Sequence, residues 1–120
     1  MRNFYRHHGN KFGNRKTTID GIEFASAKEA RRYMELKLLQ RGGEIRDLQV
    51  QPRFELMPSF KRGEETHRKI EYVADFSYTT KEGEKVVEDV KSAITKTHPV
   101  YRLKKKLLLF RHKDFTFLET

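Results

Sequence analysis

The sequence contains no cysteine, which excludes disulfide bridges and zinc sites built on thiolates. A chain without cysteine suits a reducing compartment, so we expect a cytoplasmic protein. No apolar run approaches the roughly 18 residues needed to span a bilayer, and the basic start of the chain lacks the apolar segment of a secretory signal. We therefore expect no membrane association.

Apolar residues are few and positive charges are many. Hydrophobic residues make up 36% of the 120 residues, although nine Phe and five Tyr supply large side chains for a core. This length suits one small domain. The formal net charge of +9 indicates a polyanionic partner, and it fits ribosomal, membrane-surface and DNA-binding proteins equally well.

Residues 1–16 form a segment without any acid, interrupted by glycine and asparagine. We interpret it as a flexible basic arm, although a disordered tail without function has the same composition. Residues 17–120 are then expected to form one domain. The basic residues of the arm are Arg2, Arg6, Lys11, Arg15 and Lys16.

The first helix is predicted to begin at Ser26. Ser26 and Glu29 have the spacing of a capping box, in which each side chain bonds to the backbone amide of the other residue. Glycines 42–43 end this helix. Before it, residues 17–24 predict a small hairpin with an Asp-Gly turn.

Three strands are predicted to follow the helix. Apolar and polar residues alternate over residues 50–56, which indicates a half-buried strand, and Pro52 favours the edge or margin of a sheet. Residues 58–69 are polar and predict a mobile loop. The second and third strands are expected over residues 70–78 and 85–91.

The loop between the second and third strands sets their register. Residues 81–83 form a three-residue hairpin loop, and Gly83 suits its left-handed last position. Counting back from this loop places Asp75 opposite Asp89. Two like charges facing each other destabilise a sheet, so the arrangement indicates a cation between them. A loop of two or four residues would offset the pair by one position.

A second helix is predicted to begin at His98 and Pro99, because proline is favoured in the first turn of a helix. The chain then closes with a short strand over residues 115–118. Leu108 and Leu109 widen the apolar stripe of this helix beyond what one core requires. The stripe itself consists of Val100, Leu103, Leu107 and Phe110.

The stretch from Val90 to Lys113 contains many basic residues and no acid. It fits either a solvated helix face or a surface that contacts nucleic-acid phosphates. The absence of any acid over this length favours phosphate contacts. The residues expected to make them are Arg15, Lys16, Lys96, Arg102 and Lys105.

Acids interrupt two β-type runs, where aspartate is normally rare. Asp75 lies in the second predicted strand, and Asp89 with Lys91 lies in the third. Residues two apart on a strand share a face, so Asp89 and Lys91 point the same way while Glu88 faces the other side. Two carboxylates beside a lysine, on a basic chain, indicate metal-dependent cleavage of a phosphodiester.

Phosphodiester hydrolysis needs an attacking water, charge relief and a stabilised leaving oxygen, and Mg²⁺ held by one or two carboxylates supplies all three. Asp75 and Asp89 are the candidate ligands, and the carbonyl of Val90 is a further one. Lys91 would orient the water or neutralise the phosphate. Glu29 would complete the site if the first helix packs over the hairpin.

These residues also have structural explanations. The same pattern is compatible with Asp75 as an exposed acid paired with a lysine. It is also compatible with Asp89 and Lys91 as a surface ion pair worth well under about 1 kcal/mol. The capping box already accounts for Glu29. The histidine spacings HxH and HExxH are absent, so a histidine-based nuclease is not expected.

The predicted order is helix, three strands, helix and strand, with an acid in the second strand, an Asp-x-Lys motif in the third and a glutamate in the first helix. This combination resembles the PD-(D/E)XK nuclease superfamily over residues 17–118. The proline that usually precedes the first acid is replaced by Ala74. The resemblance implies an α+β (mixed α/β) fold, with a restriction-endonuclease-like αβββαβ core whose mixed four-stranded sheet is flanked by helices. The matching residues are Glu29, Gln51, Asp75, Asp89, Val90 and Lys91.

The small size and the basic arm are most similar to phage-encoded endonucleases and Holliday junction resolvases. This resemblance implies Mg²⁺ or Mn²⁺ without a small-molecule cofactor, cleavage that leaves a 5′-phosphate, and branched DNA as substrate in a bacterial or phage-infected cell. It also implies a homodimer, built by the spare leucines of the second helix or by the arm. Asp75, Asp89 and Glu29 would hold the metal, and Lys91 would serve the nucleophile. The alternatives are a nicking or restriction-type nuclease of the same fold and a basic nucleic-acid-binding protein without catalysis.

Overall fold

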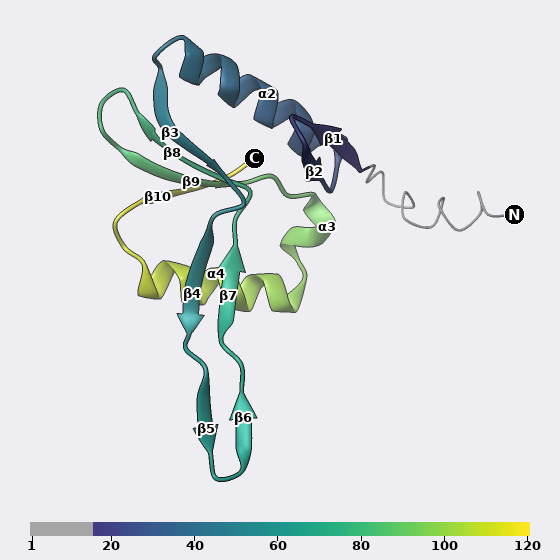
Figure 1. Ribbon diagram of the computed structural model, residues 1–120, viewed down its shortest axis with the longest axis vertical. Coiled ribbons are helices and arrows are strands. Elements are labelled where there is room, and N and C mark those ends of the chain that lie inside the picture. Colours follow the sequence, from purple (N-terminus) through teal and green to yellow (C-terminus); the bar gives the residue numbers. More distant parts are fainter. Residues whose placement is uncertain (1–15) are drawn as a thin grey trace, which may run out of the picture.

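The computed structural model describes residues 16–120, so the predicted arm lies outside the described residues except for Lys16 (Figure 1). The described chain begins with the predicted small hairpin, formed by β1 (Thr17–Ile19) and β2 (Ile22–Phe24). Its turn places Gly21 at a φ of 77°, which glycine adopts without strain. No helix within this range is long and apolar enough to cross a membrane.

The first helix, α2 (Ala27–Arg41), begins and ends as the sequence predicts. The Ser26 hydroxyl accepts a hydrogen bond from the backbone N–H of Glu29 at 3.1 Å, which satisfies one free amide of the first turn. Gly42 follows the last helical residue, and its N–H bonds back to the carbonyl of Leu38 at 3.0 Å. The buried residues of α2 are Ala30, Tyr33 and Leu36.

Four strands form one mixed sheet, which confirms an α+β architecture with a mixed four-stranded sheet. In sheet order they are β10 (Thr116–Glu119), β9 (Lys85–Asp89), β8 (Phe76–Thr80) and β3 (Ile45–Val50). β10 runs parallel to β9, and the other neighbours are antiparallel. The helices α3 (Ala93–Lys96) and α4 (Pro99–Arg111) connect β9 to β10, and α4 starts at the predicted proline.

Two of the predicted strands are each broken in two, so the expectation of continuous strands over residues 50–56 and 70–78 is wrong. The breaks fall at Gln51 and Pro52 and, just before β8, at Ala74 and Asp75. Proline has no N–H for a sheet ladder, and Gln51 adopts a left-handed φ of 55°. The chain therefore leaves the sheet as an antiparallel ribbon of two strands. These strands are β4 (Arg53–Met57) and β7 (Ile70–Val73).

The segment predicted as a loop, residues 58–69, contains a further hairpin instead. It consists of β5 (Phe60–Arg62) and β6 (Glu65–His67), and Gly63 turns the chain with a φ of 62°. Every residue of both strands is exposed, and Figure 1 shows the hairpin extending away from the rest of the molecule. Because neither side of the hairpin is buried, it lacks the apolar alternation by which a strand is predicted.

The sheet separates two core clusters, with α2 on one side and α4 on the other (Figure 1). Phe76 and Val86 pack with the buried side chains of α2. Val87, the next residue along β9, packs with Leu108 of α4 and with Tyr72 of the ribbon. Successive residues of one strand thus reach different cores, as the pleat of a strand requires.

The apolar stripe predicted for the second helix does not face the core, so this expectation is wrong. Val100, Leu103 and Phe110 are 56%, 59% and 69% exposed, and only Leu107 of the four packs against a core cluster. Leu108 is fully buried in their place. α4 has apolar residues on two sides, so helical spacing alone does not decide which side meets the sheet.

Candidate active site

The β8–β9 hairpin has the predicted loop and register. Gly83 takes the last loop position with a φ of 94°, the left-handed conformation that glycine favours. In the ladder, Phe76 pairs with Glu88. The same register continued by one residue places Asp75 opposite Asp89, as the loop length predicts.

Asp75 and Asp89 meet at the end of the hairpin, where each carboxylate accepts a hydrogen bond from a backbone amide. The backbone N–H of Asp75 donates to Oδ1 of Asp89 at 2.9 Å, and the N–H of Val90 donates to Oδ2 of Asp75 at 2.7 Å. The carboxylates thus accept backbone amides at the point where β8 begins and β9 ends. Val90, expected to offer its carbonyl to a metal, contributes its N–H to this arrangement.

The Asp89 side chain is fully buried. Its Oδ2 accepts a hydrogen bond from the Tyr72 hydroxyl, and Nζ of Lys91 lies 3.9 Å from its Oδ1. Burial raises the pKa of Asp89, and the charge of Lys91 opposes this shift. The pair is therefore not the surface ion pair that the sequence also allowed.

One pocket of about 330 Å³, which we call the carboxylate pocket, is lined by Glu29, Gln51, Asp75 and Lys91. The prediction for Glu29 required the first helix to pack over the hairpin, and α2 does bring Glu29 to this pocket. Asp89 does not line it but lies behind Asp75, bonded to its N–H. The remaining lining residues are Lys16, Glu23, Ala25 and Val73.

The acids of this pocket shift one another's ionisation. Burial, the charge of Asp75 and the hydrogen bond between the two carboxyls together raise the pKa of Glu29 to about 7, although the charge of Lys91 opposes this shift. Burial also raises the pKa of Asp75, against the opposing effects of Lys91 and the Val90 N–H. Clustered carboxyls with raised pKa values bind protons or cations readily, and they are common at functional sites.

Lys91 is held by the neighbouring strand and helix. Its backbone N–H donates to the carbonyl of Thr120 at 3.0 Å, and its Nζ lies 5.4 Å from the ring centroid of Tyr101 on α4. The side chain of Lys91 is 20% exposed, so its ammonium group retains access to solvent. From this position it can contact an anion that enters the pocket.

The donor set at the pocket fits a hydrated magnesium ion. Mg²⁺ is usually bound by one or two carboxylates and keeps several waters, and Glu29 and Asp75 supply two carboxylates to one pocket. Within residues 16–120, no group of three or more His, Cys, Asp or Glu side chains is arranged to hold a metal ion. Both oxygens of Asp89 already accept hydrogen bonds, so Asp89 can join the ion only through a remaining lone pair.

A comparison with known protein families identifies the family of the chain. The sequence model of a family described as "Protein of unknown function (DUF1064)" matches residues 9–118. The chain belongs to this family. No curated protein matches the chain, and no solved structure matches it. Every residue that lines the carboxylate pocket lies within the matched range.

Two tyrosines support the carboxylate pocket and were missed by sequence reasoning. Tyr72 donates to Asp89, and the Tyr101 hydroxyl donates to Glu119, whose carboxylate also lies 3.0 Å from Nζ of Lys105. Burial, and then Glu119, raise the pKa of Tyr101, so its hydroxyl keeps its proton. The partners of these tyrosines lie 17 and 18 residues away in the sequence, and no local pattern connects them.

The residues predicted to contact phosphates lie in different places. Lys96, Arg102 and Lys105 line one hollow of about 330 Å³ beside α4. Of these three, Lys105 is already paired with a glutamate. Lys16 lines the carboxylate pocket, and Arg15 lies outside the described residues.

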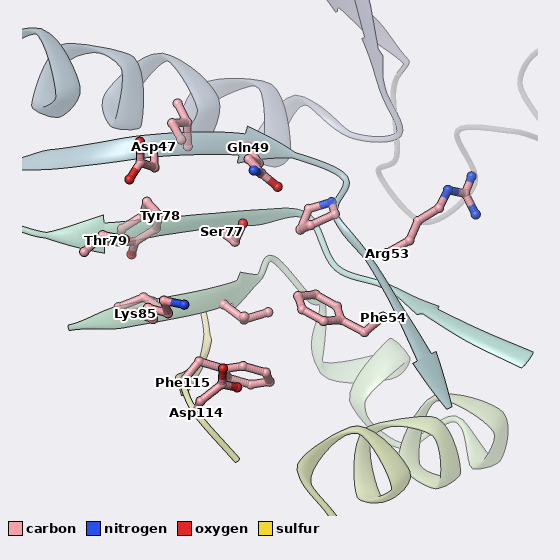
Figure 2. Close-up of a pocket in the computed structure, with 14 residues that line it drawn as sticks. Asp47, Gln49, Arg53, Phe54, Ser77, Tyr78, Thr79, Lys85, Asp114 and Phe115 are labelled. Carbon is pink, nitrogen blue, oxygen red and sulfur yellow. The ribbon is translucent and has the colours of Figure 1, made fainter. Parts of the chain in front are cut away.

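A separate cleft of about 540 Å³ lies over strands β3, β8 and β9 (Figure 2). Gln49, Ser77 and Lys85 line it from the strands, and Phe54 and Phe115 border it from β4 and from the segment before β10. It shares no lining residue with the carboxylate pocket. The cleft and the carboxylate pocket are therefore distinct.

Proposed function

We propose that this protein is a metal-dependent DNA endonuclease that hydrolyses phosphodiester bonds. The observation that carries the proposal is the pocket lined by Glu29, Asp75 and Lys91, with the buried Asp89 bonded behind it. Carboxylates for a cation and a lysine for a phosphate are the groups that this reaction needs. The net charge of +9 supports a polyanionic substrate.

Each pocket residue has a proposed role that its position supports. Glu29 and Asp75 hold the ion, and Asp89 fixes the backbone of Asp75 and offers its remaining lone pairs. Bound Mg²⁺ or Mn²⁺ supplies Lewis-acid stabilisation of the phosphate and an activated water. Lys91, held between Asp89 and the ring of Tyr101, contacts the phosphate or orients the attacking water.

The order of the elements supports the finer fold proposal. With the ribbon strands between β3 and β8 set aside, α2, β3, β8, β9, α4 and β10 follow one another as helix, three strands, helix and strand. This is the αβββαβ order of the restriction-endonuclease-like core that the PD-(D/E)XK resemblance implies. Branched DNA as the substrate and a homodimer as the active form are proposed from the same resemblance.

A cleavage panel tests the proposed activity. The full chain is incubated with a four-way junction, a flapped duplex and a linear duplex, each with Mg²⁺, with Mn²⁺ or with a chelator. We expect ion-dependent cleavage that favours the junction. Asp75→Asn and Lys91→Ala should lower the cleavage rate at least about a hundredfold while DNA binding persists. Asp114→Asn removes an exposed acid outside the pocket and is the matched control.

The same panel separates the alternatives. Equal cleavage or nicking of linear duplex would indicate a restriction-type or nicking nuclease with the same chemistry. A nucleic-acid-binding protein without catalysis is favoured by one observation: the oxygens of Asp89 are already hydrogen-bonded to Tyr72 and to the amide of Asp75. That alternative predicts DNA binding without cleavage of any shape by either ion, and no effect of Asp75→Asn.

A further inference from the structure

Helix α4 has two apolar sides, and only one of them is covered. Leu108 is fully buried against the sheet, whereas Val100, Leu103 and Phe110 are each more than half exposed. We call these three residues, together with the partly buried Leu107, the α4 seam. Apolar residues gathered on one exposed side of a helix indicate a surface that binds another molecule.

The spacing of the α4 seam is that of a coiled coil. Its positions are separated by steps of three, four and three residues, which are the a and d positions of a heptad repeat. The seam covers only about a quarter of the circumference of the helix. A narrow a/d stripe suits one neighbouring helix, whereas a helix that lies in a membrane surface presents a broader apolar face.

Cations border the α4 seam on both sides. Lys104 and Arg111 occupy e positions of the heptad, and Lys106 occupies the g position. The stretch from Val90 to Lys113 contains no acid that could balance them along the helix. Charges at e and g positions determine which helix can pair with a seam.

These charges decide between the possible occupants. A second copy of this helix would place the same cations opposite one another, and like charges at these positions destabilise a helix pair. The N-terminal residues 1–16 are basic too and contain no acid. A helix with acidic residues beside its own apolar seam is the occupant whose charges complement α4.

We propose that the α4 seam binds an amphipathic helix of a partner protein, with apolar residues at its a and d positions and acidic residues at its e and g positions. The seam is short, so the complex is transient and weakens as salt rises. None of the seam residues lines the carboxylate pocket. The proposal is independent of nuclease activity.

Fluorescence anisotropy with two labelled peptides tests the proposal. One synthetic peptide of three heptads has Leu at a and d and Glu at e and g, and the other has Lys in place of each Glu. We expect the Glu peptide to bind the full chain at least about tenfold more tightly than the Lys peptide, because only its charges complement the seam. Added salt should weaken this binding.

Substitutions on the seam identify the surface. Leu103→Ala with Phe110→Ala should weaken binding of the Glu peptide at least about tenfold, because both apolar side chains are lost from the interface. Lys106→Glu should weaken the Glu peptide and strengthen the Lys peptide. Leu38→Ala, which removes an equally exposed leucine from α2, is the matched control and should change nothing. All four positions are exposed, so the variants are expected to fold, and circular dichroism checks this.

Several outcomes would overturn the proposal. The first is that both peptides bind alike, or that neither binds. The second is a dimer of the chain alone, on a sizing column, that Leu103→Ala with Phe110→Ala dissociates, since this assigns the seam to a second copy. The third is seam-dependent binding to anionic phospholipid vesicles without binding to the Glu peptide, which assigns the seam to a lipid surface.

Discussion

Glu29 is the pocket carboxyl whose pKa lies near neutrality, at about 7 instead of its ordinary 4.5, because it is buried beside Asp75. The folded protein therefore holds this proton more tightly than the unfolded chain. The stability linked to Glu29 is fully present below the unfolded pKa and is lost as the pH rises through the folded pKa. The glutamine of Glu29→Gln cannot ionise, so the variant does not lose this stability. The difference in free energy of unfolding, variant minus wild type, should therefore become more positive between about pH 5 and about pH 8. Urea unfolding at both pH values measures this, and an unchanged difference would contradict the assigned burial.

Binding of a divalent ion by the same carboxyl gives a second prediction at the residue scale. At about pH 8, Mg²⁺ should raise the thermal unfolding midpoint of the wild-type protein, because a ligand that binds only the folded state stabilises it. Glu29→Gln and Asp75→Asn should lose most of this increase. Glu64→Gln, at the exposed tip of the β5–β6 hairpin, should keep it. Equal increases in all four proteins would place the ion elsewhere.

Spacing along the strands was enough to predict part of this site. The three-residue loop fixes the register, so the pairing of Asp75 with Asp89 was predictable. Strand alternation predicted that Glu88 faces the side of the sheet opposite to Asp89. The structure agrees, since Oε2 of Glu88 lies 2.5 Å from Nε of Arg32 on α2. The bond from Tyr72 to Asp89 was not predictable, because it depends on the bend between β7 and β8.

At the scale of elements, the ends of the helices were predictable because they depend on neighbouring residues. Ser26 caps α2, and Pro99 begins α4. The strand breaks were not predicted, although Pro52 marks one of them. The buried side of α4 was not predicted either, because the choice between its two apolar sides depends on the packing of Leu108 against the sheet.

The β5–β6 hairpin should be dispensable for folding. Every residue of its two strands is exposed, so its removal uncovers no core side chain. We expect replacement of residues 58–69 by Asn-Gly, which forms a tight turn between paired strands, to change the free energy of unfolding by less than about 1 kcal/mol. Urea unfolding of this variant and of the full chain measures the difference. Loss of cooperative unfolding would show that the hairpin contributes to the core.

At the scale of the whole molecule, positive charge is abundant but unevenly distributed. The net charge of +9 attracts a polyanion to the chain as a whole. The carboxylate pocket is lined by three acids, Glu23, Glu29 and Asp75, and by only two lysines, Lys16 and Lys91, so a phosphate that approaches the acids meets local repulsion. A bound divalent ion and Lys91 would reverse that repulsion. The net charge attracts DNA to the chain, whereas the acids of the pocket repel its phosphates. The proposed reaction therefore needs both the basic surface and the bound ion.

The salt dependence of DNA binding should distinguish free cations from a paired one. The logarithm of the binding constant falls linearly with the logarithm of salt concentration, and each phosphate contact contributes about 1 to the slope. Lys96→Ala with Arg102→Ala should therefore reduce the slope by about 2. Lys105→Ala should change it less than either single variant, because Glu119 lies 3.0 Å from its ammonium group. Anisotropy titrations of a duplex at several salt concentrations give the slopes.

The control and the contradicting result of this titration follow from the same geometry. Lys85→Ala removes an exposed lysine from the separate cleft over the sheet and should leave the slope unchanged. If Lys105→Ala lowers the slope as much as Arg102→Ala does, DNA displaces the carboxylate of Glu119. The Tyr101 hydroxyl would then lose part of its anchor, and Lys91 beside the Tyr101 ring would move when DNA binds. In that case DNA binding on α4 and the carboxylate pocket would be coupled through Tyr101 instead of acting independently.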